Sequence, residues 1–425
     1  MKVSLQKVTL IILFLISVSV KSFWGYGFFH RNPVVTSVVL MIPITLLCLI
    51  YVHNNIQMDS VVCGLALSML AVVLLSSSFS PREGLYYGLC ILLLPFSDED
   101  YFYKIPKWFY YAGIVFVFGS LINIFFPNIY SSVILPSFAQ SPQFNNLVSW
   151  VNNNYNIIIP GFTSQISFNA GYFVYGIGYL FVYYSVFNKL SLNQRLALIF
   201  FVVCLVLTNK RAHFLFLFIS MCSCFFLWGD SNARGKRFFQ LIIMAITSIV
   251  FIYILALNVD IGVLRKIRLM LEAYGSKEDI TSGRTVLWSI AMNAFLTSPL
   301  FGIGWGNYIH LPAIASHPVQ VHNIYLQLLC ETGIIGFCIF MLFFTYLFCI
   351  AINNCRIAKT NEQKIGSRFC LFVQSFFLMY GLTGNVLFDQ PYYIVYFLIC
   401  AFTLSLQKEF QTADQRALFK TGGMG

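Results

Sequence analysis

Long apolar runs separated by short polar segments dominate the pattern of this chain. A helix needs roughly 17–25 apolar residues to cross a bilayer core of about 30 Å, and most of the runs approach that length. The fourth and seventh runs are short, which suits tilted, half-buried or broken helices. We expect twelve membrane spans, at about residues 5–20, 34–52, 60–78, 84–96, 108–126, 170–187, 196–208, 213–228, 238–257, 323–350, 369–388 and 392–406.

Composition agrees with this pattern. The chain has 425 residues, of which 59% are hydrophobic and only 10% charged, and its mean hydropathy is +0.78. A soluble protein of this size cannot cover its surface with so few charges. An open sheet facing lipid is excluded because its edge amides would stay unpaired. The fold class we expect is all-α integral membrane, a polytopic bundle of about 12 transmembrane helices with a helical outer loop.

The distribution of basic residues predicts the orientation. With the N-terminus inside, the inner segments carry 16 of the 26 lysines and arginines, and the outer segments carry 10. Five of those 10 lie in one loop of about 65 residues, and long loops escape the positive-inside rule. Without that long loop, 16 basic residues lie on the inner side and 5 on the outer side, which predicts that both termini are cytoplasmic. We expect the first run to be an uncleaved span, because Lys21 and further spans follow it without a cleavage site.

These spans divide the chain into four parts: nine spans in 1–257, an outer loop at 258–322, three spans in 323–406 and a cytoplasmic tail at 407–425. A second outer loop, at about 127–169, has no charged residue but many Asn, Ser, Gln and aromatic residues. Such a loop suits either hydrogen bonding and stacking with uncharged sugars or a position on the lipid headgroups.

A short polar segment at 208–213 separates two apolar runs and predicts a tight hairpin at the outer face. It contains Lys210 and Arg211, two cations that are costly near lipid. They either extend to headgroup phosphates or form a phosphate clamp. Arg211 suits a clamp better, because its planar fork holds phosphate oxygens bidentately and stays charged. Lys210 adds a point charge.

A second arginine stands at a predicted helix start. Thr281 or Ser282 can cap a helix at about 285–296, and Pro299 marks its end. The positive end of that helix and Arg284 would form an anion site, or the segment is an ordinary capped helix with a surface arginine.

The glycines at 302, 304 and 306 lack the strand and helix context of a dinucleotide fingerprint. They favour a turn where the backbone approaches a ligand or another helix. Trp305 and Tyr308 in this turn either stack on a sugar or belong to an interfacial aromatic belt.

His322 opens the tenth span, where a neutral imidazole can accept a proton from a hydroxyl, and Asn323 beside it can orient the ring or contact substrate. A lone histidine at a span end also has a structural interpretation. Glu331, nine residues on, is about half a helical turn out of phase, so we expect it to face away from His322 in a structural role. His310 and His317 share the loop, but carboxylate and cysteine ligands at metal spacing are missing, so we expect no metal and no cofactor.

A basic stretch lies earlier in the same outer loop. Arg265 and Arg268 stand in an amphipathic segment typical of a helix lying in the membrane interface. This segment either attracts an anionic lipid carrier or has a structural role. The basic residues elsewhere are scattered over loops without a basic module, so we expect no nucleic-acid partner.

Together these motifs resemble the O-antigen ligase and polymerase superfamily. The resemblance rests on Thr208-Asn209-Lys210-Arg211, Ser282-Gly283-Arg284-x3-Trp288, Gly302-x-Gly304-x-Gly306-Asn307, His322-Asn323 and Gly333-x-x-Gly336. These motifs cover roughly residues 200–350. One departure is Lys210-Arg211-Ala212, where many relatives have Ser-Arg-Gly or Ser-Arg-Thr.

The resemblance implies a GT-C-like membrane glycosyltransferase of bacterial O-antigen or capsule assembly. Such enzymes move a glycan from an undecaprenyl-diphosphate carrier to a sugar hydroxyl, at the outer face of the inner membrane. By position, Arg211 and Arg284 would bind the diphosphate, and His322 would activate or position the acceptor hydroxyl. The implied partners are the lipid-linked donor, a glycan or lipid A-core acceptor, membrane lipid and other polysaccharide-assembly proteins.

Three alternatives remain open from the sequence. A polymerase elongates another carrier-linked glycan, whereas a ligase transfers to lipid A-core. The uncharged loop at 127–169 favours the polymerase, because it suits a neutral glycan more than a phosphorylated core. A transporter for lipid-linked sugars predicts paired halves and a polar pathway at mid-membrane, and we detect no paired halves. An assembly partner without activity is the third alternative.

Overall fold

The computed structural model describes residues 5–30, 33–54, 59–75, 81–96, 102–141, 144–152, 159–228, 283–316 and 318–421. In these ranges the regular structure is helical, apart from one isolated antiparallel bridge between Ser22 and Thr163. The longer helices are α1 (Leu5–Ser19), α2 (Phe23–His30), α3 (Pro33–Asn54), α4 (Ser60–Leu74), α5 (Pro81–Leu93), α7 (Ile105–Phe125), α9 (Phe144–Asn152), α10 (Ile166–Phe187), α11 (Leu192–Leu207), α12 (Arg211–Leu227), α15 (Arg284–Thr297), α16 (Ile324–Ile357), α17 (Asn361–Tyr380) and α18 (Gln390–Thr421). Four short turns complete the list: α8 (Pro127–Ile129), η1 (Tyr130–Ile134), η2 (Leu135–Phe138) and η4 (Tyr308–His310).

The all-helical class is confirmed for the described residues. Within the described part of the chain, five helical segments are long and apolar enough to cross a membrane: Val34–His53, Ile105–Phe125, Ile166–Phe187, Ile324–Ile357 and Gln390–Ala413. Shorter apolar helices occupy Leu5–Ser19, Ser60–Leu74, Glu83–Leu93, Leu192–Leu207 and Arg211–Leu227. The predicted span at 238–257 and most of the outer loop that follows it lie outside the described residues, so the count of twelve spans stays a prediction.

Several boundaries differ from the sequence-based expectation. The tenth span, expected at 323–350, corresponds to a helix that continues to Ile357. The predicted span at 369–388 ends at Tyr380, because a polar segment with Gly381, Gly384 and Asn385 interrupts the helix before α18. The last helix does not end at 406 but continues to Thr421, so much of the predicted polar tail is helical.

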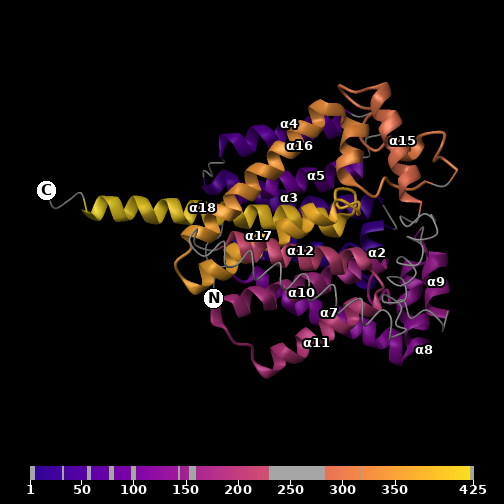
Figure 1. The fold of residues 1–425 in the computed structure, drawn as a ribbon, viewed down its shortest axis with the longest axis horizontal. Coiled ribbons are helices and arrows are strands. Elements are labelled where there is room, and N and C mark those ends of the chain that lie inside the picture. Colours follow the sequence, from indigo (N-terminus) through magenta and orange to yellow (C-terminus); the bar gives the residue numbers. More distant parts are fainter. Residues whose placement is uncertain are drawn as a thin grey trace.

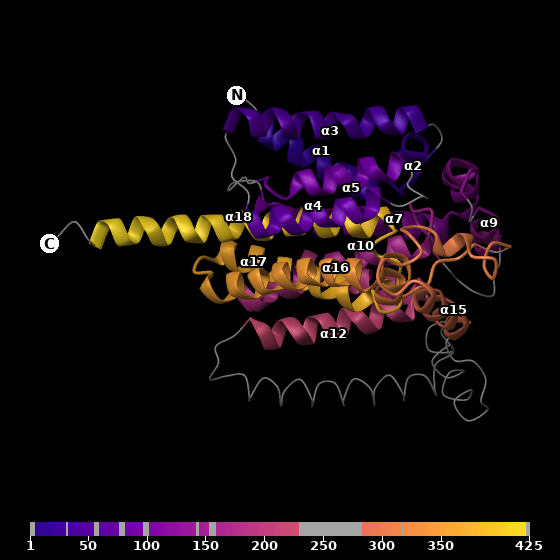
Figure 2. The same cartoon turned by 90° about the horizontal axis from the view of Figure 1, so that it is seen from above.

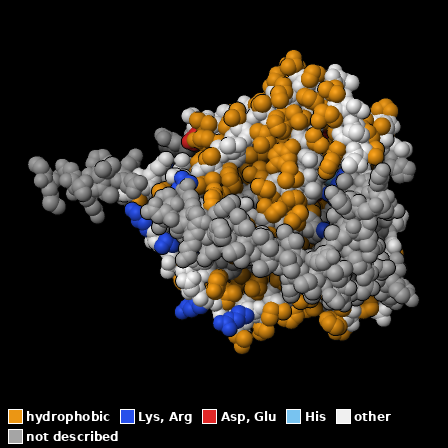
Figure 3. All heavy atoms as spheres, in the orientation of Figure 1, with side chains coloured by type: hydrophobic (Ala, Val, Ile, Leu, Met, Phe, Trp, Pro, Cys, Tyr) orange, Lys and Arg blue, Asp and Glu red, His pale blue; other side chains and the backbone are white. Residues whose placement is uncertain are grey.

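The helices of the bundle run roughly side by side between two ends (Figures 1 and 2). Helix α1 begins and α18 leaves the bundle at one end, which we call the terminal end. The short elements α8 and α9 and helix α15 lie at the opposite end, which we call the loop end. In Figure 3, hydrophobic side chains cover much of the visible surface on either side of the grey residues, and most of the visible lysines and arginines lie toward the terminal end. A bilayer requires an extended apolar surface of this kind.

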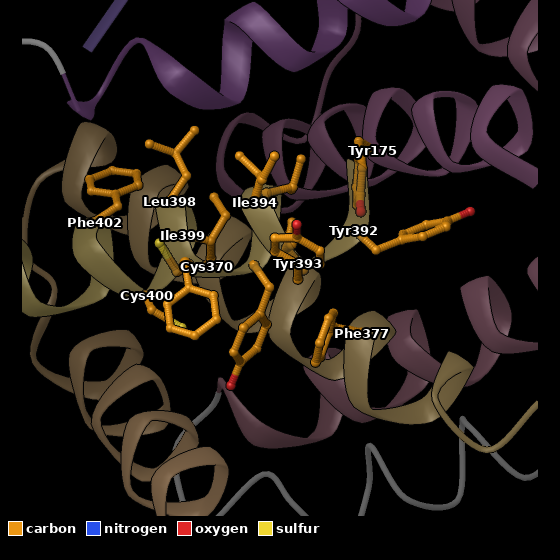
Figure 4. Close-up of a cluster of buried hydrophobic side chains, with 14 of the residues drawn as sticks. Tyr175, Cys370, Phe377, Tyr392, Tyr393, Ile394, Leu398, Ile399, Cys400 and Phe402 are labelled. Atoms are coloured by element: carbon orange, nitrogen blue, oxygen red, sulfur yellow. The ribbon is translucent and has the colours of Figure 1, made fainter. Parts of the chain in front are cut away.

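Helix α18 lies at the centre of the bundle. Its apolar segment is 83% buried, whereas that of α3 is only 28% buried, so α18 packs inside and α3 faces outward. Figure 4 shows Tyr392, Tyr393, Leu398 and Phe402 of α18 among side chains from α10 and α17. This central packing fixes the start of α18 next to the ends of the neighbouring helices, where the candidate site lies.

Candidate active site

A break in helix α16 organises the loop end. Gly333 has φ 63° and ψ −170°, a left-handed conformation that glycine adopts without a Cβ penalty. The loop at 299–304 supplies the hydrogen bonds that the break would otherwise leave unmade. The amides of Ile303 and Gly304 donate to the carbonyls of Cys330 (3.0 Å) and Glu331 (2.8 Å). The amide of Ile334 donates to the carbonyl of Pro299 (2.8 Å) in return. Non-helical backbone inside a predicted span requires such pairing.

Glu331 holds the rest of the glycine loop. Its carboxylate accepts hydrogen bonds from the amide of Gly306 (2.9 Å), the amide of Tyr308 (3.2 Å) and the side chain of Gln327 (3.2 Å). Glu331 is 1% exposed. The carboxylate therefore satisfies backbone donors of a turn, and we interpret its role as structural.

Trp305 and Tyr308 lie inside the protein. Trp305 is 2% exposed, and its ring stacks on Phe388 (4.7 Å between centroids) and Phe340 (5.6 Å) and meets the edge of Tyr87. Tyr308 is fully buried, and its hydroxyl donates to the carbonyl of Leu287 (2.8 Å). These positions favour a packing role that anchors the glycine loop, and a sugar contact for either ring stays a prediction.

His322 is held by Asn385, which lies in the loop between α17 and α18. The amide N–H of His322 donates to Asn385 Oδ1 (2.9 Å), and Asn385 Nδ2 lies 3.1 Å from His322 Nδ1. Asn323 has a different task, because its Oδ1 accepts from the amides of Tyr325 and Leu326 and caps α16. The ring is thus oriented by a residue 63 positions away and not by its neighbour.

A left-handed backbone conformation occurs at two of the motif residues, Asn209 and His322. Three described residues other than glycine have positive φ: Asn188, Asn209 (57°) and His322 (56°). Asn209 lies in the short polar segment before α12, and His322 precedes α16. Such conformations persist where the surroundings enforce them, and they cluster at functional sites.

The cations of the predicted motifs lie within electrostatic reach of one another. Arg211 is the first residue of α12 and Arg284 the first of α15, so both stand at positive helix ends. Burial lowers the pKa of Arg211, and the positive charge of Arg284 lowers it further. An anion with more than one negative charge would relieve the repulsion between the two guanidinium groups and could accept hydrogen bonds from both.

His322 belongs to this cationic group. Burial lowers the pKa of His322 to about 4, and the positive charges of Arg284 and Lys210 contribute to the shift. The imidazole is therefore neutral near pH 7. Desolvation raises the pKa of Asp389, at the start of α18, while Lys21 and Lys210 counteract the rise. Arg211, Arg284, His322 and Lys210, which we call the cation cluster, thus come from three separate stretches of the chain.

Other residues singled out from the sequence cannot be compared with the structure. Thr281, Ser282, His317, Arg265 and Arg268 lie outside the described residues. Helix α15 is present where a helix was predicted, and Gly283 with φ 82° stands at its N-cap. Among the described residues, we find no group of three His, Cys, Asp or Glu side chains that would hold a metal ion.

Two residues of the site were missed by the sequence analysis. Asn385 and Asp389 lie in a stretch that was assigned to a membrane span and to the turn after it. The signal was present, because Thr383, Gly384 and Asn385 interrupt the apolar run, and polar residues inside a span indicate function.

The described residues form an apolar helical bundle of the kind found in polytopic membrane proteins, and the cation cluster lies at one of its ends. The sequence profile of the O-antigen ligase family matches residues 196–341, which reach from α11 into α16 and contain Arg211, Arg284 and His322. The resemblance of this chain to the O-antigen ligase and polymerase superfamily is therefore confirmed over this segment. No curated protein matches the chain.

Proposed function

We propose that this protein is a membrane glycosyltransferase that moves a glycan from an undecaprenyl-diphosphate carrier to a sugar hydroxyl at the outer face of the bacterial inner membrane. The observation that carries the proposal is the cation cluster. The positive charge of Arg284, at the start of α15, lowers the pKa of Arg211, at the start of α12. The charges of Arg284 and Lys210 both lower the pKa of His322.

The chemistry of the transfer explains why such a cluster is needed. The acceptor oxygen bonds to the anomeric carbon while the bond from that carbon to the diphosphate breaks, and the electron pair of this bond passes to the diphosphate oxygen. Donors already aimed at the developing charge stabilise it without reorganisation. Arg211 and Arg284 fit this role as bidentate donors, and Lys210 adds a further charge.

The position of the cluster favours an enzyme over a transporter. Its members lie where α12, α15 and α16 begin, at the loop end of the bundle, whereas a transporter holds its substrate near mid-membrane. Helix α1 begins and helix α18 leaves the bundle at the other end, which agrees with cytoplasmic termini and an outer site. The orientation in the membrane is part of the proposal.

Within this reaction class we favour a polymerase. The uncharged segment at 127–169 includes α8 and α9, which lie at the loop end together with α15 (Figure 1). An uncharged segment at the same end of the bundle suits a neutral glycan acceptor more than a phosphorylated core. The alternative is a ligase that transfers the glycan to lipid A-core.

Deletion of the gene, followed by complementation, tests this function. A polymerase predicts loss of long surface chains while single-repeat capping remains; a ligase predicts loss of all glycan from lipid A-core with carrier-linked chains accumulating. Arg211→Ala and Arg284→Ala should fail to complement, and Arg195→Ala, at an exposed position beside Leu190, should complement fully. Full complementation by the variant lacking both Arg211 and Arg284 would contradict the assigned site.

A further inference from the structure

The amide orientation of Asn385 is determined by its two contacts with His322. The amide N–H of His322 is a donor, so the atom 2.9 Å from it must be the acceptor Oδ1. The other end of the same side chain, the Nδ2 amino group, then faces the imidazole Nδ1 at 3.1 Å. Rotating the amide by half a turn would place two donors against each other, at the backbone contact.

This orientation selects the tautomer of His322. The Nδ2 group of asparagine only donates, so Nδ1 of the ring must accept. In a neutral imidazole the other nitrogen then carries the proton, and Nε2 is the N–H. The loop that holds Asn385 is itself fixed, since the Asn385 carbonyl accepts from the amides of Phe388 (2.8 Å) and Asp389 (3.0 Å).

The Nε2–H of His322 remains available to a ligand. In the described part of the chain, Nε2 has no hydrogen-bond partner from the protein. It is also absent from the set of fully buried atoms without a partner, so this nitrogen is open to a ligand. The charges that act on this ring most strongly are the cations Arg284 and Lys210. A hydrogen-bond donor beside these two side chains is suited to an anionic oxygen.

We infer that Asn385 is a positioning residue that keeps His322 in the Nε2–H form, and that His322 therefore acts as a hydrogen-bond donor to the leaving diphosphate and not as the base for the acceptor hydroxyl. This inference rests on the function proposed above and deepens it. The His322 ring keeps its proton throughout the transfer. The proton of the acceptor hydroxyl passes to an oxygen of the released diphosphate, which balances the charge that the broken bond leaves there.

Nitrogen NMR of the histidine-labelled protein in detergent measures the tautomer directly. His322→Gln assigns the signals of the ring by their disappearance. We expect Nδ1 to show the shift of an unprotonated ring nitrogen and Nε2 that of a protonated one. The reverse assignment would overturn the inference, whatever the activity of the protein.

Asn385→Asp tests the positioning role. A carboxylate can still accept from the His322 amide, but it also accepts from the ring, so it should move the proton to Nδ1. We expect exchanged ring shifts and a fall in kcat on the order of 100-fold, the effect of removing one donor to a developing oxyanion. Asn188→Asp makes the same substitution at another asparagine with positive φ, at the end of α10, and should leave kcat unchanged. If His322 were the base, Asn385→Asp would keep or raise kcat.

His322→Gln separates a donor from a base by rescue. Its side-chain amide can donate a hydrogen bond but cannot take a proton at neutral pH. We expect it to be roughly tenfold more active than His322→Ala, a partial recovery of the donor effect. Equal inactivity of the two variants would overturn the inference and leave the transferase proposal intact. If His322→Ala itself transferred glycan normally, the proposed site would fail instead.

Discussion

Gly302 and Gly333 pack the glycine loop against the break in α16 without room for a side chain on either residue. A Cβ on Gly302 would lie 2.4 Å from the carbonyl carbon of Glu331, and one on Gly333 would lie 2.3 Å from the carbonyl oxygen of Leu300. Both residues have positive φ, 70° and 63°. The two glycine motifs of the sequence are thus the two sides of one backbone contact, and this contact fixes the loop that carries Trp305.

Alanine at Gly302 or Gly333 should therefore destabilise the protein. Each variant places a side chain in a left-handed conformation, at about 1–2 kcal/mol, and adds a clash with backbone atoms that cannot move away. The expected result is a lower midpoint of thermal unfolding in detergent. Gly64→Ala is the matched control, because a Cβ there meets no atom within 4 Å in helix α4. Equal unfolding midpoints for Gly302→Ala and Gly64→Ala would contradict the packing described.

Trp305 variants distinguish packing from sugar binding. Trp305→Ala should lower the free energy of unfolding by about 3–5 kcal/mol, as for other large aromatic residues truncated in a core. Trp305→Phe should recover most of the stability because a ring remains between its neighbours, and it should also recover the KM for the glycan acceptor. A stable Trp305→Phe protein with a strongly raised KM would instead favour a direct sugar contact.

The pH dependence of His322 follows from its environment. The pKa of His322 in the folded protein is about 4, below its ordinary value of 6.5. The unfolded chain therefore binds more protons than the folded chain between these values. Protonation of this ring opposes folding as the pH falls from about 6.5 to 4, and the imidazole stays neutral above that window.

Nitrogen NMR across this pH range checks the prediction. We expect the His322 ring signals to be constant between about pH 6 and 8, where a neutral imidazole does not titrate. Arg284→Gln removes one positive charge and should raise the pKa of His322. If the His322 ring of the wild-type protein instead titrated with a midpoint near the ordinary pKa of 6.5, the ring would be neither buried nor close to the cations.

The helical membrane class could be predicted from the sequence, because long apolar runs with few charged residues are compatible with few other folds. The sequence also placed the described spans closely where runs were uniformly apolar, as in α10. It failed at 369–388, because hydropathy averaged over a window hides the short polar segment Thr383-Gly384-Asn385 between two apolar stretches.

The site was predictable in part. Arg211, Arg284 and His322 carry recognisable motifs, and electrostatics links all three in the structure. The part played by Asn385 depends on contacts between residues far apart in the chain, which spacing does not encode. Trp305 shows the opposite problem, since an aromatic residue in a glycine-rich turn has the same sequence pattern whether it is packed inside or open to a sugar.

The affinity of the purified protein for a short-chain prenyl diphosphate tests the central claim most directly. Arg211→Gln and Arg284→Gln should each weaken binding by on the order of tenfold or more, the effect of losing a charged hydrogen bond. The double variant should lose less than the sum of the two free-energy changes, because groups that share one ligand are coupled. Arg195→Gln should bind as the wild type does. Unchanged affinity in both single variants, or fully additive losses, would contradict a single diphosphate site built by Arg211 and Arg284.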